Sequence, residues 1–269
     1  MDLPRSIITL TTDFGTRDYF SGAMKGVILG IAPDARLVDI SHDVPSHDVW
    51  GAAYLIGAAY RFFPARSIHL VVVDPGVGSQ RRPILAVTDR HYFVAPDNGV
   101  LSFIYRDPGL SRVIHITSEH YFLPSEGSTF QARDIFAPAA AWLLKGVEAD
   151  KFGEEITDYA RFNIPAPRKE GEGVLAGEVV YTDKFGNSIT NISMSDLRGL
   201  AGPSGGDSFK IAVGEMVIEG LSPFYASVKR GGTGVVVNGN GFLEVFVNQG
   251  DARRAMGIKR GDGVRIIFG

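Results

Sequence analysis

A carboxylate and a guanidinium group follow an apolar run in the first half of the chain. Asp74 comes directly after residues 68–73, and Arg81 follows a short turn that contains two glycines. A short apolar run of this kind is typical of a buried parallel strand, and ligands of such sheets bind beyond the carboxyl ends of the strands. Asp74 can accept a hydrogen bond or a proton, and Arg81 can donate several hydrogen bonds. The alternative is an ordinary strand exit, with Asp74 capping the loop and Arg81 in solvent.

A second carboxylate is predicted at the same edge of the sheet. Asp13 follows residues 7–12, which are isoleucine, leucine and threonine and favour a strand. If this strand is parallel to residues 68–73, Asp13 and Asp74 face one crevice. A carboxylate there is suited to accept hydrogen bonds from a ribose diol. The alternative is that Asp13 or Asp18 caps the helix that follows.

Two further polar segments could contribute to a ligand site. Residues 128–134 precede an Ala-rich helix predicted for residues 135–144, with Asp134 near its first turn, so we expect the polar side chains before it to face the crevice. The loop at residues 182–188 offers Asp183, Phe185 and Asn187. As a ligand loop, it could hold an ammonium group, stack on a purine ring and read the purine edge. As a turn, it is unremarkable.

Several other kinds of site are disfavoured. His42, Asp43, His47 and Asp48 have no defined metal-ligand spacing, and Asp48 is better explained as a helix cap, so we predict no metal. The glycine-rich segments lack the residues of a phosphate-binding loop. A net charge of −3 and a pI near 6.1 give no basic footprint for nucleic acid or an anionic membrane surface.

Composition also gives expectations for the size of the core and for the cellular compartment. The chain has 269 residues, of which 45% are hydrophobic, enough for one large or two smaller cores. It has no cysteine, no basic segment followed by an apolar signal core, and no apolar stretch of the ~20 residues that span a bilayer. These features favour a cytoplasmic protein.

The pattern of the chain predicts two domains. Alternating strand-like and helix-like segments in residues 1–165 indicate an α/β domain with a mostly parallel sheet and flanking helices. Residues 166–173 carry prolines, charges and glycines without apolar periodicity and are the predicted linker. Residues 174–269 contain short β-rich runs separated by glycine, which suggest a small antiparallel β-barrel or sandwich. The predicted strands and helices cover residues 7–12, 20–31, 36–40, 49–62, 68–73, 84–87, 92–95, 135–144, 174–181, 209–213, 216–218, 233–237, 242–247 and 264–268.

Taken together, these motifs resemble those of the S-adenosyl-L-methionine (SAM) hydroxide adenosyltransferases, or adenosine-forming SAM hydrolases, which are related to fluorinase and chlorinase. The resemblance runs nearly end to end and rests on several ordered motifs. They are residues 12–15, 74–78, 95–99, 133–138, 183–187 and 190–192.

The resemblance implies an amino-terminal α/β domain, a carboxy-terminal β-barrel domain and a homotrimer with active sites at subunit interfaces. It implies SAM as substrate, adenosine and methionine as products, and no cofactor. The catalytic residues would be Asp74, Arg81 and Gln131, which hold the attacking water. The residues that would bind the substrate are Asp13 at the ribose, Thr129 and Phe130 beside the reacting carbon, Asp183 at the ammonium group, Phe185 and Tyr225 around the adenosyl group, and Asn187 at the adenine edge.

The sequence departs from the family pattern at two places. Gln131 stands where the hydrolases have His, and residues 238–241 lack the Ser that commonly helps to bind the methionine carboxylate. The halogenase branch has Tyr at the position of Asp74, and fluorinase has a long insertion where this chain has the short Asp89-Arg90 turn. An anionic Asp74 would repel a halide, which favours the hydrolase branch. Two alternatives remain open, a SAM- or adenosine-binding protein with reduced or lost turnover and a halide-using adenosyltransferase.

Overall fold

The computed structural model describes residues 7–201 and 209–268 and divides the chain into two compact units. The first unit ends at Asn163 and the second begins at Ile164. Within the predicted linker 166–173, β8 (Arg168–Lys169) pairs with β9 (Val174–Thr182), so part of this segment belongs to the second sheet. The predicted domain limits begin at residue 1 and end at residue 269, which lie outside the described residues.

The first unit contains a seven-stranded sheet in the order β2-β1-β3-β5-β4-β6-β7. Five of its strands run in one direction, because β2, β1, β3 and β5 are parallel neighbours and β6 is antiparallel to β4, which is antiparallel to β5. The predicted mostly parallel sheet is confirmed. The strands are β1 (Ile7–Thr12), β2 (Arg36–Ser41), β3 (Ile68–Val72), β4 (Pro83–Thr88), β5 (Tyr92–Pro96), β6 (Leu110–Ile116) and β7 (Gly153–Ile156).

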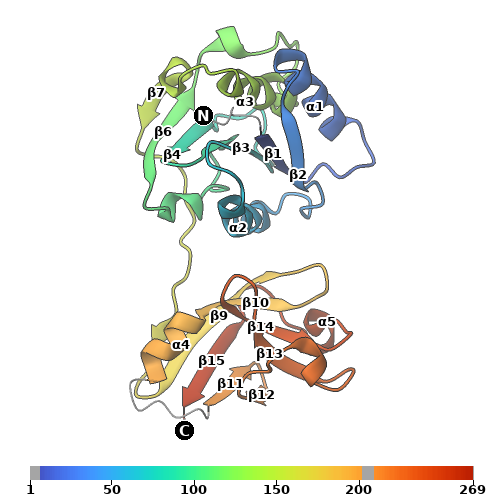
Figure 1. Cartoon of the computed structure of the whole chain (residues 1–269), viewed down its shortest axis with the longest axis vertical. Coiled ribbons are helices and arrows are strands. Elements are labelled where there is room, and N and C mark those ends of the chain that lie inside the picture. The colour runs from blue at the N-terminus through green and yellow to red at the C-terminus, as the bar shows by residue number, and fades with distance from the viewer. Residues whose placement is uncertain (1–6, 202–208, 269) are drawn as a thin grey trace. The chain divides into compact units, whose positions relative to one another are not determined.

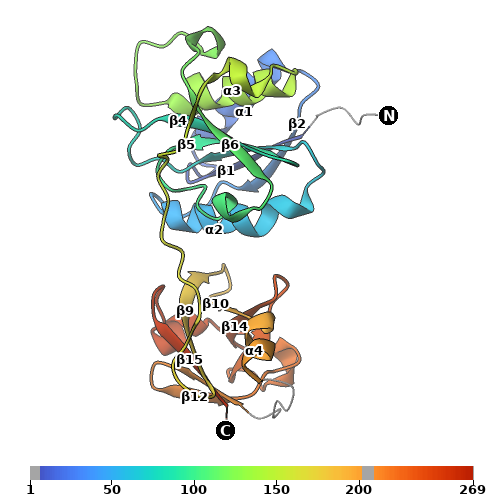
Figure 2. The ribbon, with the colours of Figure 1, turned by 90° about the vertical axis from the view of Figure 1, so that its left-hand side faces the viewer.

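Helices cover both faces of this sheet. α1 (Phe20–Ile31) and α3 (Ala137–Leu144) lie on one face and α2 (Val49–Ala59) on the other (Figures 1 and 2). α1 buries Ser21, Met24 and Ile28, which recur at helical spacing, and Pro33 follows directly after its C-cap. The unit is therefore a three-layer α/β structure with an apolar core on each side of the sheet.

Two predicted helices differ in their boundaries. The helix predicted for residues 49–62 changes at residue 60 to a 3₁₀ turn, Tyr60–Phe62. The helix predicted to start at Ile135 begins earlier, with a π-helical turn at Ala132–Phe136 that leads into α3. Pro138 has no N–H to donate to the carbonyl of Asp134, and this carbonyl accepts a hydrogen bond of 2.9 Å from Leu123 N instead.

The second unit is an antiparallel sheet that nearly closes into a barrel, as the sequence predicts. Its order is β12-β11-β15-β9-β10-β14-β13, and Ser222 N donates a hydrogen bond of 2.7 Å to Val235 O in the last strand. The other elements are β10 (Ser188–Ser193), α4 (Met194–Ala201), β11 (Phe209–Val213), β12 (Met216–Glu219), β13 (Thr233–Val237), β14 (Phe242–Val247), α5 (Ala252–Met256) and β15 (Gly263–Phe268).

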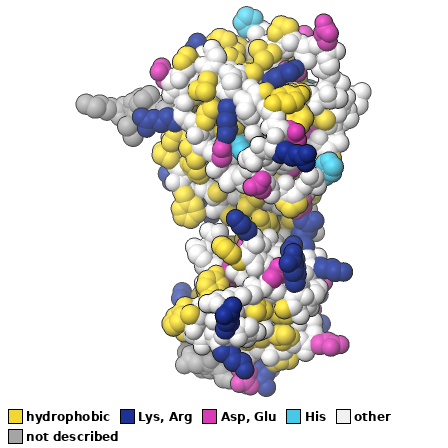
Figure 3. Space-filling view, turned by 90° about the vertical axis from the view of Figure 1, so that its right-hand side faces the viewer, with side chains coloured by type: hydrophobic (Ala, Val, Ile, Leu, Met, Phe, Trp, Pro, Cys, Tyr) yellow, Lys and Arg dark blue, Asp and Glu magenta, His cyan; other side chains and the backbone are white. Residues whose placement is uncertain are grey.

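Charged side chains of both signs lie among hydrophobic ones on the face drawn in Figure 3. Within residues 7–201 and 209–268, no helix is long and apolar enough to cross a bilayer.

Candidate active site

A buried ion pair lies just beyond the end of β3. Arg81 Nε donates a hydrogen bond of 3.0 Å to Asp74 Oδ1, and Arg81 Nη2 donates to Asp74 Oδ2. The side chains of Arg81 and Asp74 are only 8% and 5% exposed. This bidentate arrangement fixes the plane of the guanidinium group and the direction of the carboxylate. The alternative in which Arg81 is solvated is therefore wrong.

Gln131 completes this cluster from the start of the π-helical turn. Its Oε1 accepts a hydrogen bond of 2.5 Å from Arg81 Nη2, and the guanidinium carbon of Arg81 lies 5.1 Å from the centre of the Phe136 ring. Arg81 Nη1 is buried and has no hydrogen-bond partner among the residues that the structure describes. An unsatisfied buried donor is costly, so this N–H group still requires an acceptor.

The backbone around Asp74 is held from two sides. Asn98 Nδ2 donates a hydrogen bond of 2.9 Å to Val73 O, directly before Asp74. Gly78 has a φ of +79°, and a Cβ there would lie 3.0 Å from Ser128 Oγ. The Asp74 loop therefore packs closely against the segment that carries Gln131, which requires a glycine at this contact.

Asp13 lies at the same sheet edge as Asp74. β1 and β3 are parallel neighbours, with Thr12 opposite Val72. Asp13 Oδ2 accepts a hydrogen bond of 2.9 Å from His47 N. The N-cap of α1 is Tyr19, without a side-chain capping bond, so neither Asp13 nor Asp18 caps this helix.

Thr129 and Phe130 directly precede Gln131 in the chain. Thr129 is exposed, while the Phe130 ring packs edge-on against Phe20 at 5.2 Å and Phe14 at 6.2 Å. Asp134, in the following turn, is buried and pairs with Arg133, whose Nε lies 2.6 Å from Asp134 Oδ1. A cavity of about 390 Å³ adjoins this region. Its lining residues are Glu119, Phe122, Leu123, Pro124, Ser125, Gly127, Ser128, Gln131, Asp134 and Ile135.

The second unit holds the other predicted residues in the loop after β9. Asp183 Oδ1 accepts hydrogen bonds of 2.9 Å from both Phe185 N and Asn187 N, and its Oδ2 accepts one of 3.2 Å from Asn187 Nδ2. Gly186 has a φ of +86°, and a Cβ there would lie 2.2 Å from Asp251. The loop is thus folded around the Asp183 carboxylate and needs glycine at its tip.

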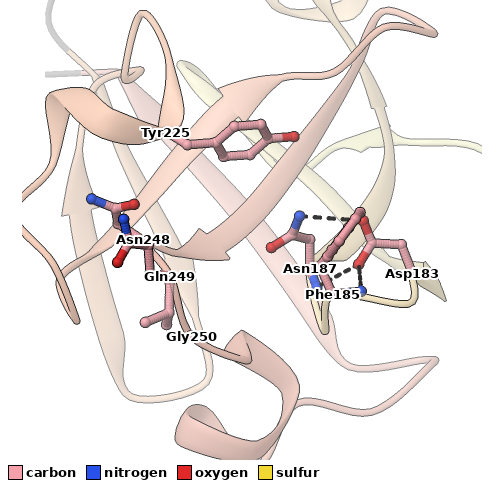
Figure 4. A pocket seen from close by; sticks show the side chains of 8 residues that line it. Asp183, Phe185, Asn187, Tyr225, Asn248, Gln249 and Gly250 are labelled. Carbon is pink, nitrogen blue, oxygen red and sulfur yellow. Dashed lines mark hydrogen bonds between the residues drawn. The ribbon is translucent and has the colours of Figure 1, made fainter.

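This loop forms one side of a cavity of about 510 Å³. Phe185 and Tyr225 are 72% and 45% exposed, and Figure 4 shows Tyr225 with its hydroxyl group directed toward the side of Asn187 and Asp183. The residues that line the cavity are Asp183, Phe185, Asn187, Tyr225, Val247, Asn248, Gln249 and Gly250. Residues 248–250 are not among the predicted site residues. Their signal is a polar turn directly after the apolar run at 242–247, with Gln249 at a φ of +56°.

The structure therefore places the ten predicted residues in two sets. Asp74 and Gln131 both bind Arg81, with Asp13, Thr129 and Phe130 in the same unit. Asp183, Phe185, Asn187 and Tyr225 line the cavity of the other unit.

The histidine-rich segment before α2 has a structural role. Asp48 is the N-cap of α2, as predicted, and its Oδ1 accepts a hydrogen bond of 3.1 Å from Gly51 N. Among the described residues, no three acidic or histidine side chains are grouped so that they could hold a metal ion.

An α/β unit with a buried Asp–Arg cluster beyond its central strands, joined to a barrel-like unit with an aromatic cavity, defines a two-domain class of ligand-binding protein. Residues 8–153 match the SAM hydroxide adenosyltransferase N-terminal domain, and residues 177–265 match its C-terminal domain. The chain belongs to the SAM hydroxide adenosyltransferase family.

Relatives of known name agree with this membership. The chain is 38% identical to an (R)-S-adenosyl-L-methionine hydrolase of Methanocaldococcus jannaschii, over 71% of this chain and 68% of that protein. It is 34% identical to the hydrolase of the same name from Thermus thermophilus, over 95% of this chain and 97% of that protein. A crystal structure of an uncharacterized conserved protein from Thermotoga maritima superimposes with a TM-score of 0.88 at 34% identity, covering 97% of this chain and 99% of that one.

Proposed function

We propose that the protein hydrolyses SAM to adenosine and L-methionine. The observation that carries this proposal is the buried Asp74–Arg81–Gln131 cluster with one unpartnered guanidinium N–H, in a chain of this family. In the reaction, the oxygen of a water forms a bond to the 5′-carbon of the ribose while the bond from that carbon to sulfur breaks. Methionine leaves as a neutral thioether, and its departure requires no general acid.

Only the water needs activation. We assign to the unpartnered Arg81 Nη1 the hydrogen bond to the water oxygen, and to the Asp74 carboxylate the role of accepting its proton. Hydroxide and sulfonium neutralise each other as they react, so transfer into a water-poor pocket beside Phe130 favours the transition state over the separated ions. The substrate's ammonium group would bind at Asp183, its adenosyl group between Phe185 and Tyr225, and its adenine edge at Asn187, with the ribose at Asp13.

Gln131 takes the place of the family histidine in this proposal. Its Oε1 is bound to Arg81, which leaves its Nε2 hydrogens free to orient the water. An amide neither becomes cationic nor relays a proton, so turnover rests on Asp74 and Arg81.

The proposal includes a homotrimer with active sites at subunit interfaces, and residence in the cytoplasm. The trimer is supported by the division of the site residues between two units, and the compartment by the absence of cysteine from the sequence. If one subunit supplies Asp13 and its neighbour supplies Asp183, mixing inactive Asp13→Ala and Asp183→Ala proteins after dissociation restores part of the activity. No recovery despite demonstrated subunit exchange would argue against the shared site.

The direct test is incubation of the purified protein with SAM and chromatographic analysis for adenosine and methionine. The name of the relatives specifies the R configuration at sulfur, so both sulfonium epimers are assayed separately. Binding of SAM without adenosine formation would show a binding protein that has lost turnover with the histidine. Formation of a 5′-halo-adenosine with added chloride or bromide would show a halide-using enzyme, which the charge of Asp74 disfavours.

A further inference from the structure

A buried carboxylate lies beside the cavity of the second unit and has no part in the reaction described above. Glu244, in β14, is 4% exposed. Its Oε1 accepts a hydrogen bond of 2.7 Å from the hydroxyl group of Tyr225. Among the described residues, no cation pairs with this carboxylate. Because burying an unpaired carboxylate is costly, packing alone does not account for glutamate at this position.

The alternation of β14 directs Glu244 away from the barrel core. Leu243 and Val245 belong to the core cluster, so Glu244 and Phe246 face the other side of the strand. The Tyr225 ring meets Phe246 edge-on at 4.9 Å with an interplanar angle of 89°. Tyr225 is therefore held at two points, by ring packing on Phe246 and by the hydrogen bond of its hydroxyl group to Glu244.

These two contacts matter because Tyr225 is poorly covered. Its side chain lines the cavity and is 45% exposed, so few neighbours restrict its rotation (Figure 4). Burial, the hydrogen bond to Glu244 and the charges of Glu244 and Asp183 raise the pKa of Tyr225 above its ordinary value. The hydroxyl group therefore remains a donor to Glu244 over the neutral pH range.

We propose that Glu244 is a positioning residue for substrate binding, which holds the Tyr225 ring as a fixed wall of the adenosyl pocket. This inference rests on the proposed function, since it assigns the pocket to the adenosyl group. A ring that is fixed before binding lowers the entropy lost when the ligand is bound. The pair acts on binding in both ground and transition states, so its loss raises KM and leaves kcat nearly unchanged.

The test uses the full-length protein and a double-mutant cycle of Glu244→Gln and Tyr225→Phe. Kinetics with SAM and calorimetric titration with adenosine are measured for each variant, with Glu219→Gln at an exposed position of β12 as the matched control. We expect each single variant to raise KM for SAM and Kd for adenosine about fivefold or more, because Glu244→Gln removes the charge of the acceptor and Tyr225→Phe removes the donor of the same hydrogen bond. The double variant should lose little more than either single variant.

Three results with the variants would overturn the inference. They are an unchanged KM in folded Glu244→Gln, an unchanged KM in Tyr225→Phe, and an effect of Glu244→Gln that persists in full when Tyr225 is already Phe. If Glu244→Gln does not fold, Tyr225→Phe alone decides, because it removes the donor of this hydrogen bond and leaves Glu244 in place. A wild-type protein that forms no adenosine from SAM but binds adenosine, with the expected loss in the variants, would overturn the proposed function and support the positioning role. A wild-type protein that does neither would overturn both.

Discussion

The cluster beyond β3 and the cavity of the second unit are built in opposite ways. Asp74 and Arg81 are almost fully buried and bonded to each other before any ligand arrives. Phe185 and Tyr225 expose 72% and 45% of their surface at the cavity. The first arrangement is a preorganised set of charges, which stabilises developing charge without reorganisation. The second offers aromatic surface that a flat, partly apolar ligand would cover.

This contrast separates the expected effects of mutations in the two units. Changes in the buried cluster should act on turnover, because the proposed function assigns its groups to the attacking water. Changes in the open cavity should act on binding, because its contacts are present in both the ground state and the transition state.

The largest effect is expected for Asp74→Asn. The amide keeps the volume of the side chain but removes the proton acceptor and one half of the ion pair with Arg81. We expect kcat to fall by about 10²–10⁴, the usual contribution of general acid–base assistance, with KM changed only a few-fold. Thermal unfolding must be followed as well, because breaking a buried pair typically costs about 3–5 kcal/mol.

Asp158→Asn is the matched control for Asp74→Asn. Asp158 also pairs with an arginine, since its Oδ1 lies 2.8 Å from Arg82 Nη1, but its side chain is 78% exposed. The Asp158→Asn variant should keep kcat within about twofold of the wild-type value, because an exposed ion pair contributes little to stability. If folded Asp74→Asn has the same kcat as the wild type, Asp74 has no role in the chemical step.

The second largest effect is expected for Asp183→Ala, which should lower the affinity for SAM and adenosine. The carboxylate accepts three hydrogen bonds within its own loop, so its loss should weaken both SAM and adenosine binding. If Asp183 also holds the ammonium group, the affinity for SAM should fall about tenfold more than that for adenosine, which lacks this group. Calorimetric titration with the two ligands measures the difference. Equal losses would limit Asp183 to shaping the loop, and a normal KM with collapsed kcat would contradict a binding role.

The sequence predicts the strands and helices whose residue pattern is typical of a buried element. The strand at 7–12 and the helix at 20–31 are observed at the predicted limits. The helix buries residues at helical spacing, whereas the strand is buried on both faces from Ile8 to Thr12. β7 is not predicted. It is an edge strand with two exposed glutamates, Glu154 and Glu155, and pairs with β6 on one side only.

The candidate site is predictable where residues follow strands in sequence. Asp13 and Asp74 are found at one edge because β1 and β3 are parallel neighbours. The bond from Arg81 to Gln131 joins residues 50 positions apart, and no local pattern predicts it. The role of Glu244 is not predictable for a different reason. A charged residue in a strand is expected to face solvent, and only the hydrogen bond from Tyr225 in the folded structure explains the buried glutamate.

A smaller effect is expected for Gln131→His, which tests whether the buried cluster is complete. If the family histidine assists proton removal, this variant should raise kcat with water by about tenfold, a part of what general base assistance supplies. Adenosine affinity should stay nearly unchanged, and a new ionisation should appear in the pH–rate profile. Stopped-time assays from pH 5.5 to 9 provide both measurements. An unchanged kcat and pH profile in a folded variant would assign water activation to Asp74 and Arg81 alone.

The smallest effect concerns the dependence of stability on pH, which should also differ between the two units. All six histidines lie between residues 42 and 120, so the second unit contains none. His69 is fully buried, and its Nδ1 lies 2.8 Å from Thr9 Oγ1. Burial, with a smaller contribution from the charge of His91, lowers the pKa of His69 to about 3.

In the unfolded chain, His69 has an ordinary pKa of about 6.5, so below this pH the unfolded state binds a proton that the folded state rejects. The free energy of unfolding of the first unit should therefore decrease by about 2 kcal/mol from this residue between pH 7 and pH 5. Both tryptophans, Trp50 and Trp142, belong to the first unit, so their fluorescence during urea unfolding follows that unit alone. In His69→Gln, the decrease in the free energy of unfolding between pH 7 and pH 5 should be smaller by about this amount. His120→Gln, at an exposed position, should show the same decrease as the wild type. If His69→Gln and the wild type lose stability in parallel between pH 7 and pH 5, the buried histidine does not cause the acid sensitivity.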